Sequence, residues 1–172
     1  MILMLTSTQS VPWFSTPEQY ASARRRRCVF EFFTEHEIDL YLTFTYVNQS
    51  LPAMSKHATN LFKRMNRYCL KYYETEVAYL WLYEFGKLNG RPHLHAALDL
   101  RGIELEDFPI HLFSNWWPHG SWYPGEIHNV ERLMWYMAGT NAKVNTPGIQ
   151  FSTHYLTRYF GRSRPPRPSA FN

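Results

Sequence analysis

Two imidazoles and a carboxylate, His93, His95 and Glu84, lie close together within residues 79–100 of this 172-residue chain. Side chains alternate in character before Asn89-Gly90, and a second alternating run follows it, which predicts two β-strands. Asn-Gly is the dipeptide most typical of a tight hairpin turn. A turn centred there places Glu84 opposite His95, and His93 shares their face because side chains alternate across a strand.

This set of side chains suits one divalent cation, Mg²⁺ or Mn²⁺, with coordination positions left open for a substrate. A carboxylate on an apolar strand is costly to bury unless it is paired or bound to a metal. The alternative is that the histidines are surface residues or have hydrogen-bond partners in the core. We predict a metal site at Glu84, His93 and His95, with Asp99 on the same face orienting His95.

The composition indicates a single folded domain with a mildly basic character. Apolar residues make up 45% and aromatic residues 17% of the chain, which excludes wholesale disorder. The net charge of +4 permits an anionic partner. Cys28 and Cys69 have neither metal-binding nor redox spacing, and no apolar run approaches the ~20 residues of a membrane span. We therefore expect a cytoplasmic protein with reduced thiols and no membrane partner.

The elements that must position the site follow a simple order along the chain. From residue 40 the patterns predict strand, helix, strand, strand, helix, strand. This order is the split βαβ, ferredoxin-like or RRM-like arrangement, an α+β fold with an antiparallel sheet and helices on one face. The opposite face would be open for a site, and a further helix would follow the last strand. The expected ranges are strands at 40–46, 79–85, 93–100 and 125–128, and helices at 56–73 (capped by Ser55), 104–117 and 130–143 (capped by Asn129).

The two ends of the chain differ in composition from this core. We expect residues 1–27 to form a basic arm, residues 28–162 the folded domain, and residues 163–172 an extended or disordered tail. Residues 28–33 are assigned to an edge strand. Arg24, Arg25, Arg26 and Arg27 are read as a phosphate-contacting patch, with a solvated charge run as the alternative.

Three further segments carry short motifs. Residues 41–45 read Tyr-Leu-Thr-Phe-Thr, residues 91–95 read Arg-Pro-His-Leu-His, and residues 117–120 read Trp-Pro-His-Gly. In this order, and with the acidic Glu84 on the preceding strand, they resemble the motifs of HUH endonucleases, the rolling-circle replication initiators (Rep) of plasmids and phages. The resemblance covers roughly residues 40–143 and implies that Glu84, His93 and His95 are the metal ligands.

The third motif of that family, Tyr-x-x-Lys on a final helix, is only partly present. Lys143 matches the lysine, Thr140 stands where the nucleophilic tyrosine is expected, and Tyr136 matches the earlier tyrosine of two-tyrosine members. A second partial match at residues 155–162 contains Tyr159. Tyr136 and Tyr159 both remain candidate nucleophiles, and Tyr136 is ranked first because it shares a helical face with Lys143.

The resemblance implies a metal-dependent, site-specific nicking and joining of single-stranded DNA through a tyrosyl-DNA intermediate, which would initiate rolling-circle replication. It implies Mn²⁺ or Mg²⁺ as cofactor, and single-stranded or hairpin origin DNA and a host helicase as partners, in the cytoplasm of a prokaryotic host. Arg24–Arg27, Thr43 and Thr45 are the expected DNA-binding residues. Two alternatives stay open: a nuclease-dead origin-binding relative, and an RRM-like binder of single-stranded nucleic acid.

Overall fold

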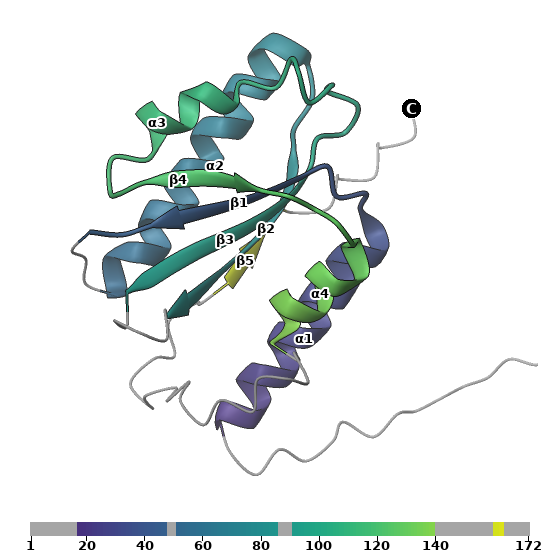
Figure 1. Cartoon of the computed structure of the whole chain (residues 1–172), viewed down its shortest axis with the longest axis vertical. Helices are drawn as coiled ribbons and strands as arrows, with labels where there is room; N and C mark the ends of the chain where they lie inside the picture. The colour runs from purple at the N-terminus through teal and green to yellow at the C-terminus, as the bar shows by residue number, and fades with distance from the viewer. Residues whose placement is uncertain (1–16, 48–50, 86–90, 140–159, 164–172) are drawn as a thin grey trace, which may run out of the picture.

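The computed structural model describes residues 17–47, 51–85, 91–139 and 160–163. Its centre is a five-stranded antiparallel sheet with helices on both faces (Figure 1). The expected α+β class with an antiparallel sheet is therefore confirmed. Within the described ranges, no helix combines the length and the hydropathy that a membrane crossing needs.

The strand order is that of a split βαβ fold with one strand added. The sheet runs β4-β1-β3-β2-β5, and β1 and β2 each pair antiparallel with β3, so they run parallel with one strand between them. The fifth strand, drawn yellow in Figure 1, pairs with β2 and was not expected. The bounds are β1 Leu40–Thr45, β2 Ala78–Phe85, β3 Pro92–Asp99, β4 Trp122–Gly125 and β5 Phe160–Arg162.

Helix α2 (Leu51–Tyr73) and the short helix α3 (Phe113–Trp116), which follows a 3-10 turn at Ile110–Leu112, cover one face of the sheet. The apolar stripe predicted for α2 is buried against it: Ala58, Leu61, Phe62, Met65 and Cys69. Helix α2 begins before Ser55, so the proposed cap is wrong. In place of one helix over 104–117, the chain forms turns that end in α3.

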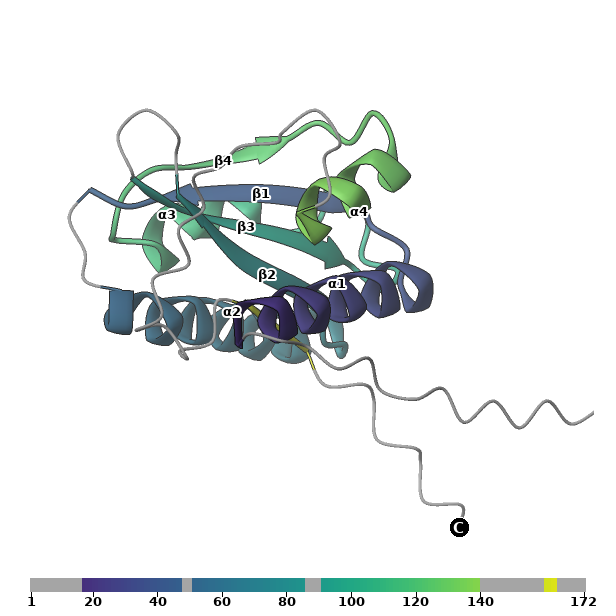
Figure 2. The same cartoon turned by 90° about the horizontal axis from the view of Figure 1, so that it is seen from below.

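Helices α1 (Pro17–Glu35) and α4 (Val130–Ala138) cover the opposite face, where they pack on Leu80, Leu82 and Ala97 (Figure 2). The expectation that this face is open is therefore wrong. The edge strand at residues 28–33 is also wrong, because that segment is helical. Val29 and Phe32 are three residues apart, so a helix buries both on one side. Helix α1 runs through the boundary that we expected after residue 27.

The hairpin of β2 and β3 has a register two residues away from the predicted one. Glu84 is paired with His93, and Leu82 is paired with His95. A shift of two residues leaves every side chain on its predicted face, because the pleat repeats every two residues. The Asn89-Gly90 turn lies outside the described residues.

Helix α4 ends earlier than residue 143. Gly139 is its C-cap, with φ 77°, a left-handed conformation that glycine adopts without a steric penalty. Asn129 is the N-cap, as predicted, and its side chain accepts a hydrogen bond from the Arg132 N–H at 2.7 Å. The strand expected at 125–128 lies instead at Trp122–Gly125.

Candidate functional site

His95 is the residue around which the site is built. The hydroxyl of Tyr41 lies 2.6 Å from His95 Nδ1, and the Thr43 hydroxyl lies 3.2 Å from the same atom. The pairing of β1 with β3 produces this contact, since Thr43 stands opposite His95 and Tyr41 is two residues along the same face. Gly125 opposite Tyr41 leaves room for the phenol, because a Cβ there would lie 2.5 Å from the ring. These contacts fix Nδ1 and direct Nε2 away from β1.

Glu84 lies on the other side of His95, with its Oε2 3.2 Å from His95 Nε2. The hydrogen bond with His95, helped by the Tyr136 hydroxyl and the Arg25 charge, lowers the pKa of Glu84 to about 2, although burial opposes this. Burial raises the pKa of Tyr41 to about 12. At neutral pH the site therefore holds an ionised carboxylate beside a protonated phenol.

Tyr136 comes into this site from α4. Its hydroxyl donates a hydrogen bond to Glu84 Oε2 and lies 3.4 Å from His95 Nε2. Burial, together with the hydrogen bond to the charged Glu84, raises the pKa of Tyr136 well above its usual value. The phenolic oxygen therefore lies beside both a carboxylate and an imidazole, which joins the predicted nucleophile to two of the predicted ligands.

Arg25 was predicted as a DNA contact, but it points into the protein. Its Nε and Nη2 donate hydrogen bonds to the Met137 carbonyl at 3.0 and 2.8 Å. Its charge acts on Glu84 and Tyr136, and burial lowers its own pKa. No local pattern indicated this contact, because the helix that carries Arg25 was not predicted.

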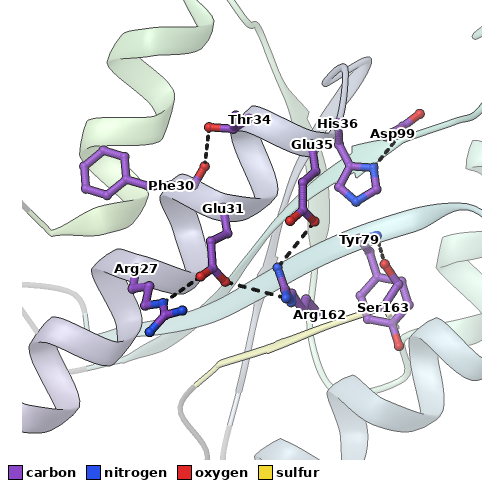
Figure 3. Close-up of polar contacts among 10 residues, drawn as sticks. All are labelled: Arg27, Phe30, Glu31, Thr34, Glu35, His36, Tyr79, Asp99, Arg162 and Ser163. Atoms are coloured by element: carbon purple, nitrogen blue, oxygen red, sulfur yellow. Dashed lines mark hydrogen bonds and ion pairs between the residues drawn. The ribbon is translucent and has the colours of Figure 1, made fainter. Parts of the chain in front are cut away.

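The four consecutive arginines do not share one surface. Successive residues of a helix point in directions about 100° apart. Arg24 is exposed, whereas Arg26 is half-buried. Arg27 pairs with Glu31 on the outside of α1, with Nε 2.6 Å from Oε1 (Figure 3). Any DNA contact by these residues would come from separate sides of α1.

His93, Thr45 and Asp99 lie on the same sheet face at its two ends. His93 stands between Glu84 and Thr45 in the pairing, and its ring centroid is 6.3 Å from that of His95. The Thr45 hydroxyl donates to the Ser121 carbonyl at 3.1 Å. Asp99 does not orient His95, because it pairs with His36 Nδ1 at 2.8 Å (Figure 3). Tyr41 makes the contact that was expected of Asp99.

The Trp-Pro-His-Gly segment closes against the end of β1 from the other face. Trp117 is buried, and its indole N–H donates to the Thr45 carbonyl at 3.0 Å. Gly120 allows this close approach, because a Cβ there would lie 2.2 Å from the Thr45 carbonyl oxygen. The ring of His119 stacks on His57 of α2 with centroids 3.6 Å apart. The segment thus supports the strand end that carries Thr45.

Three residues singled out in the sequence, Thr140, Lys143 and Tyr159, lie outside the described residues. The described chain resumes directly after Tyr159 with β5. Arg162 of β5 lies 3.6 Å from Glu31 and 3.7 Å from Glu35, and the Ser163 hydroxyl accepts the Tyr79 N–H at 3.1 Å (Figure 3). These contacts attach β5 to both α1 and the sheet.

Among the described residues, no three His, Cys, Asp or Glu side chains are grouped closely enough to hold a metal ion as they stand. Glu84 and His95 are in contact, but the Tyr136 hydroxyl touches both, and His93 stands apart from His95. The types of donor still fit a divalent cation. His95 has its Nδ1 held by Tyr41, which is the usual arrangement of an imidazole that ligates through Nε2.

Comparison with known families bears on this geometry. The model of a family of replication-associated proteins, described by its ORF2 member, matches residues 39–162. The chain belongs to this family. The match spans the whole sheet together with Glu84, His93, His95 and Tyr136, and α1 with Arg25 precedes it. No curated protein and no solved structure matched the chain. Membership of this replication-associated family indicates a role in DNA replication, as expected from the motifs.

Proposed function

We propose that this protein is an HUH-type endonuclease that nicks and rejoins single-stranded DNA at a replication origin through a covalent tyrosyl-DNA intermediate. The observation that carries the proposal is the position of the Tyr136 hydroxyl. It donates to Glu84 and lies beside His95 Nε2, in a protein whose family acts in replication. A phenol held against a carboxylate and an imidazole is suited to nucleophilic attack.

Glu84, His93 and His95 are the residues that would hold the Mn²⁺ or Mg²⁺. The ion would polarise a non-bridging phosphate oxygen and neutralise the charge that develops there. Its three donors come from one sheet face, and two of them, Glu84 and His93, are directly paired. The Tyr41 hydroxyl keeps the His95 ring in the orientation that presents Nε2 to Glu84.

The bond changes follow from the contacts of Tyr136. The phenolic oxygen attacks the phosphorus, the bond from phosphorus to the 3′ oxygen breaks, and the DNA keeps its 5′ phosphate as an ester of Tyr136. The phenolic proton passes first to Glu84, which accepts its hydrogen bond, and the leaving 3′ oxygen takes a proton from water. Arg25 adds a positive charge near Glu84 and Tyr136. The reverse attack by the 3′-hydroxyl reseals the strand.

The remaining expectations from the sequence belong to the same proposal. Lys143 would stabilise phosphate charge, and Tyr159 is the second candidate nucleophile. Thr43 and Thr45 line the β1 side of the site, where DNA would enter. Single-stranded or hairpin origin DNA is the substrate, a host helicase separates the strands, and the reaction takes place in the cytoplasm.

A nuclease-dead origin-binding relative is the second candidate function. Burial and Glu84 raise the pKa of Tyr136, which makes its ionisation harder, and Thr140 stands at the family's tyrosine position. An RRM-like binder is less well supported, because such proteins stack bases on an open sheet face. Here α1 and α4 pack over Leu80, Leu82 and Ala97 of the face that would have to be open.

The experiment that separates these functions uses labelled single-stranded oligonucleotide pools with Mn²⁺. An active enzyme yields a covalent band on a denaturing gel, and the label stays with the protein when it is on the 3′ side of the nick. A label retained from the 5′ side would contradict the proposed 5′-phosphotyrosyl bond. Retarded mobility on a native gel without any covalent band would favour the nuclease-dead function.

A further inference from the structure

The outer face of α2 is strongly basic. Helix α2 contains no Asp or Glu in its 23 residues. Its exposed cations, which we call the α2 basic face, are Lys56, Lys63, Arg64, Arg67 and Lys71. At about 100° per residue these five side chains fall within an arc of about 100° on the helix. From residue 56 to residue 71 they extend over about 22 Å at 1.5 Å per residue.

No carboxylate among the described residues pairs with any member of the α2 basic face. The ion pairs of the described chain lie elsewhere, on α1, in the site and after β4. Exposed Arg27 on α1, by contrast, has Glu31 at 2.6 Å. Lys71 donates to the Tyr72 hydroxyl at 3.1 Å and lies over its ring, which leaves its charge uncompensated. Like charges aligned without counter-charges repel one another, and an anionic polymer would relieve that repulsion.

We infer that the α2 basic face binds the phosphate backbone of a DNA duplex, the stem of a hairpin, while the adjacent single strand occupies the site. The inference rests on the proposed function for DNA as the ligand. Single-strand binding surfaces place aromatic rings between their cations, and the arc of the α2 basic face contains none. Its length of about 22 Å matches about six base-pair steps of 3.4 Å.

The position of α2 connects the basic face to the site. Helix α2 and the α1–α4 pair lie on opposite sides of the sheet (Figure 1). The first turn of α2 reaches the end of β2, where the Tyr83 hydroxyl donates to the Met54 carbonyl. Tyr83 directly precedes Glu84. A stem lying along α2 would therefore end at the sheet edge that carries Glu84, and its unpaired strand would continue round that edge.

The test compares two labelled DNAs, a hairpin with a single-stranded tail and an unstructured oligo-dT of equal length. Fluorescence anisotropy over a salt series gives affinity and salt dependence for the full chain, for the Lys63→Gln/Arg67→Gln variant, and for Arg132→Gln as a control. Arg132 is an exposed cation on α4. The substituted side chains are exposed, so the thermal midpoint of each variant should stay at the wild-type value.

For hairpin DNA we expect the double variant to lose at least about tenfold in affinity, with the slope of log K against log salt shallower by about 1.8, or 0.9 per phosphate contact. Oligo-dT binding and the control should be within about twofold of wild type. An unchanged hairpin affinity and slope would overturn the inference, as would an equal loss for both DNAs. If wild type forms no covalent adduct, the proposed nicking fails, while this comparison still decides whether the α2 basic face binds a stem.

Discussion

The guanidinium of Arg25 donates two hydrogen bonds to the main-chain carbonyl of Met137, the residue after Tyr136. The last carbonyls of a helix have no partner within it and carry partial negative charge, so a buried cation there is stabilising. Helix α1, which precedes the family match, thus holds the end of α4 that presents the predicted nucleophile. Gly139 completes this end, because a Cβ there would lie 3.7 Å from the guanidinium.

Replacing Arg25 by Gln should destabilise the protein. Both charge-assisted hydrogen bonds to Met137 are lost, and we expect the free energy of unfolding to fall by about 1.5–3 kcal/mol. Urea unfolding followed by circular dichroism measures this. Arg27→Gln on the same helix is the matched control, because it removes an exposed ion pair and should leave the midpoint unchanged. Equal effects of the two substitutions would show that the Arg25 contact adds nothing.

Tyr41→Phe should loosen His95 without emptying the space that the ring fills. The substitution removes the hydroxyl 2.6 Å from His95 Nδ1 and keeps the ring. If His95 ligates the metal, losing this partner should weaken Mn²⁺ affinity by about 10–100-fold. Isothermal titration calorimetry with Mn²⁺ measures the change, and Tyr123→Phe, an exposed tyrosine of β4, is the control. Wild-type affinity in Tyr41→Phe would remove Tyr41 from this role.

His95→Ala should abolish the metal-dependent rise in the thermal midpoint. A cation that binds the folded state alone stabilises it by RT ln(1 + [L]/Kd), about 2.7 kcal/mol at a concentration of 100 Kd. Differential scanning fluorimetry with and without Mn²⁺ measures the rise. His128→Ala, at an exposed histidine that pairs with Glu126, should keep the wild-type response. A persistent Mn²⁺ shift in His95→Ala would place the metal elsewhere.

The low pKa of Glu84 predicts how stability changes in acid. Folding lowers this pKa from 4.5 to about 2, so ionised Glu84 stabilises the folded protein above pH 4.5, and that contribution is lost as pH falls from 4.5 towards 2. In metal-free buffer, Glu84→Gln should therefore lose less stability than wild type over this interval. Urea midpoints at a series of pH values test this. Parallel curves for the two proteins would mean that Glu84 keeps an ordinary pKa.

Local patterns in the sequence predicted the faces of the elements better than their contacts. The alternation along β2 and β3 placed Glu84, His93 and His95 on one face, and that result survives a register error of two residues. The stripe of α2 was equally clear, because Leu61, Met65 and Cys69 repeat with the helical period. Both signals depend on neighbours within one element.

What failed depends on contacts between distant parts of the chain. Residues 28–33 are rich in phenylalanine, which favours a strand, but burial of Val29 and Phe32 under the sheet stabilises a helix. Arg25 and Met137 are far apart in sequence, so nothing local indicates their contact. Tyr41 was read as part of a strand motif, and its hydrogen bond to His95 depends on the pairing of β1 with β3.

The nucleophile is tested most directly by the covalent adduct with labelled single-stranded origin DNA in Mn²⁺. Wild type, Tyr136→Phe and Tyr159→Phe are compared on denaturing gels, with DNA binding measured in parallel. Phenylalanine keeps the ring of Tyr136 and removes the oxygen that touches Glu84 and His95. We predict that Tyr136→Phe binds DNA and forms no adduct, whereas Tyr159→Phe forms it as wild type does. A wild-type adduct yield in Tyr136→Phe would contradict the assignment, and its loss in Tyr159→Phe would move the nucleophile to Tyr159.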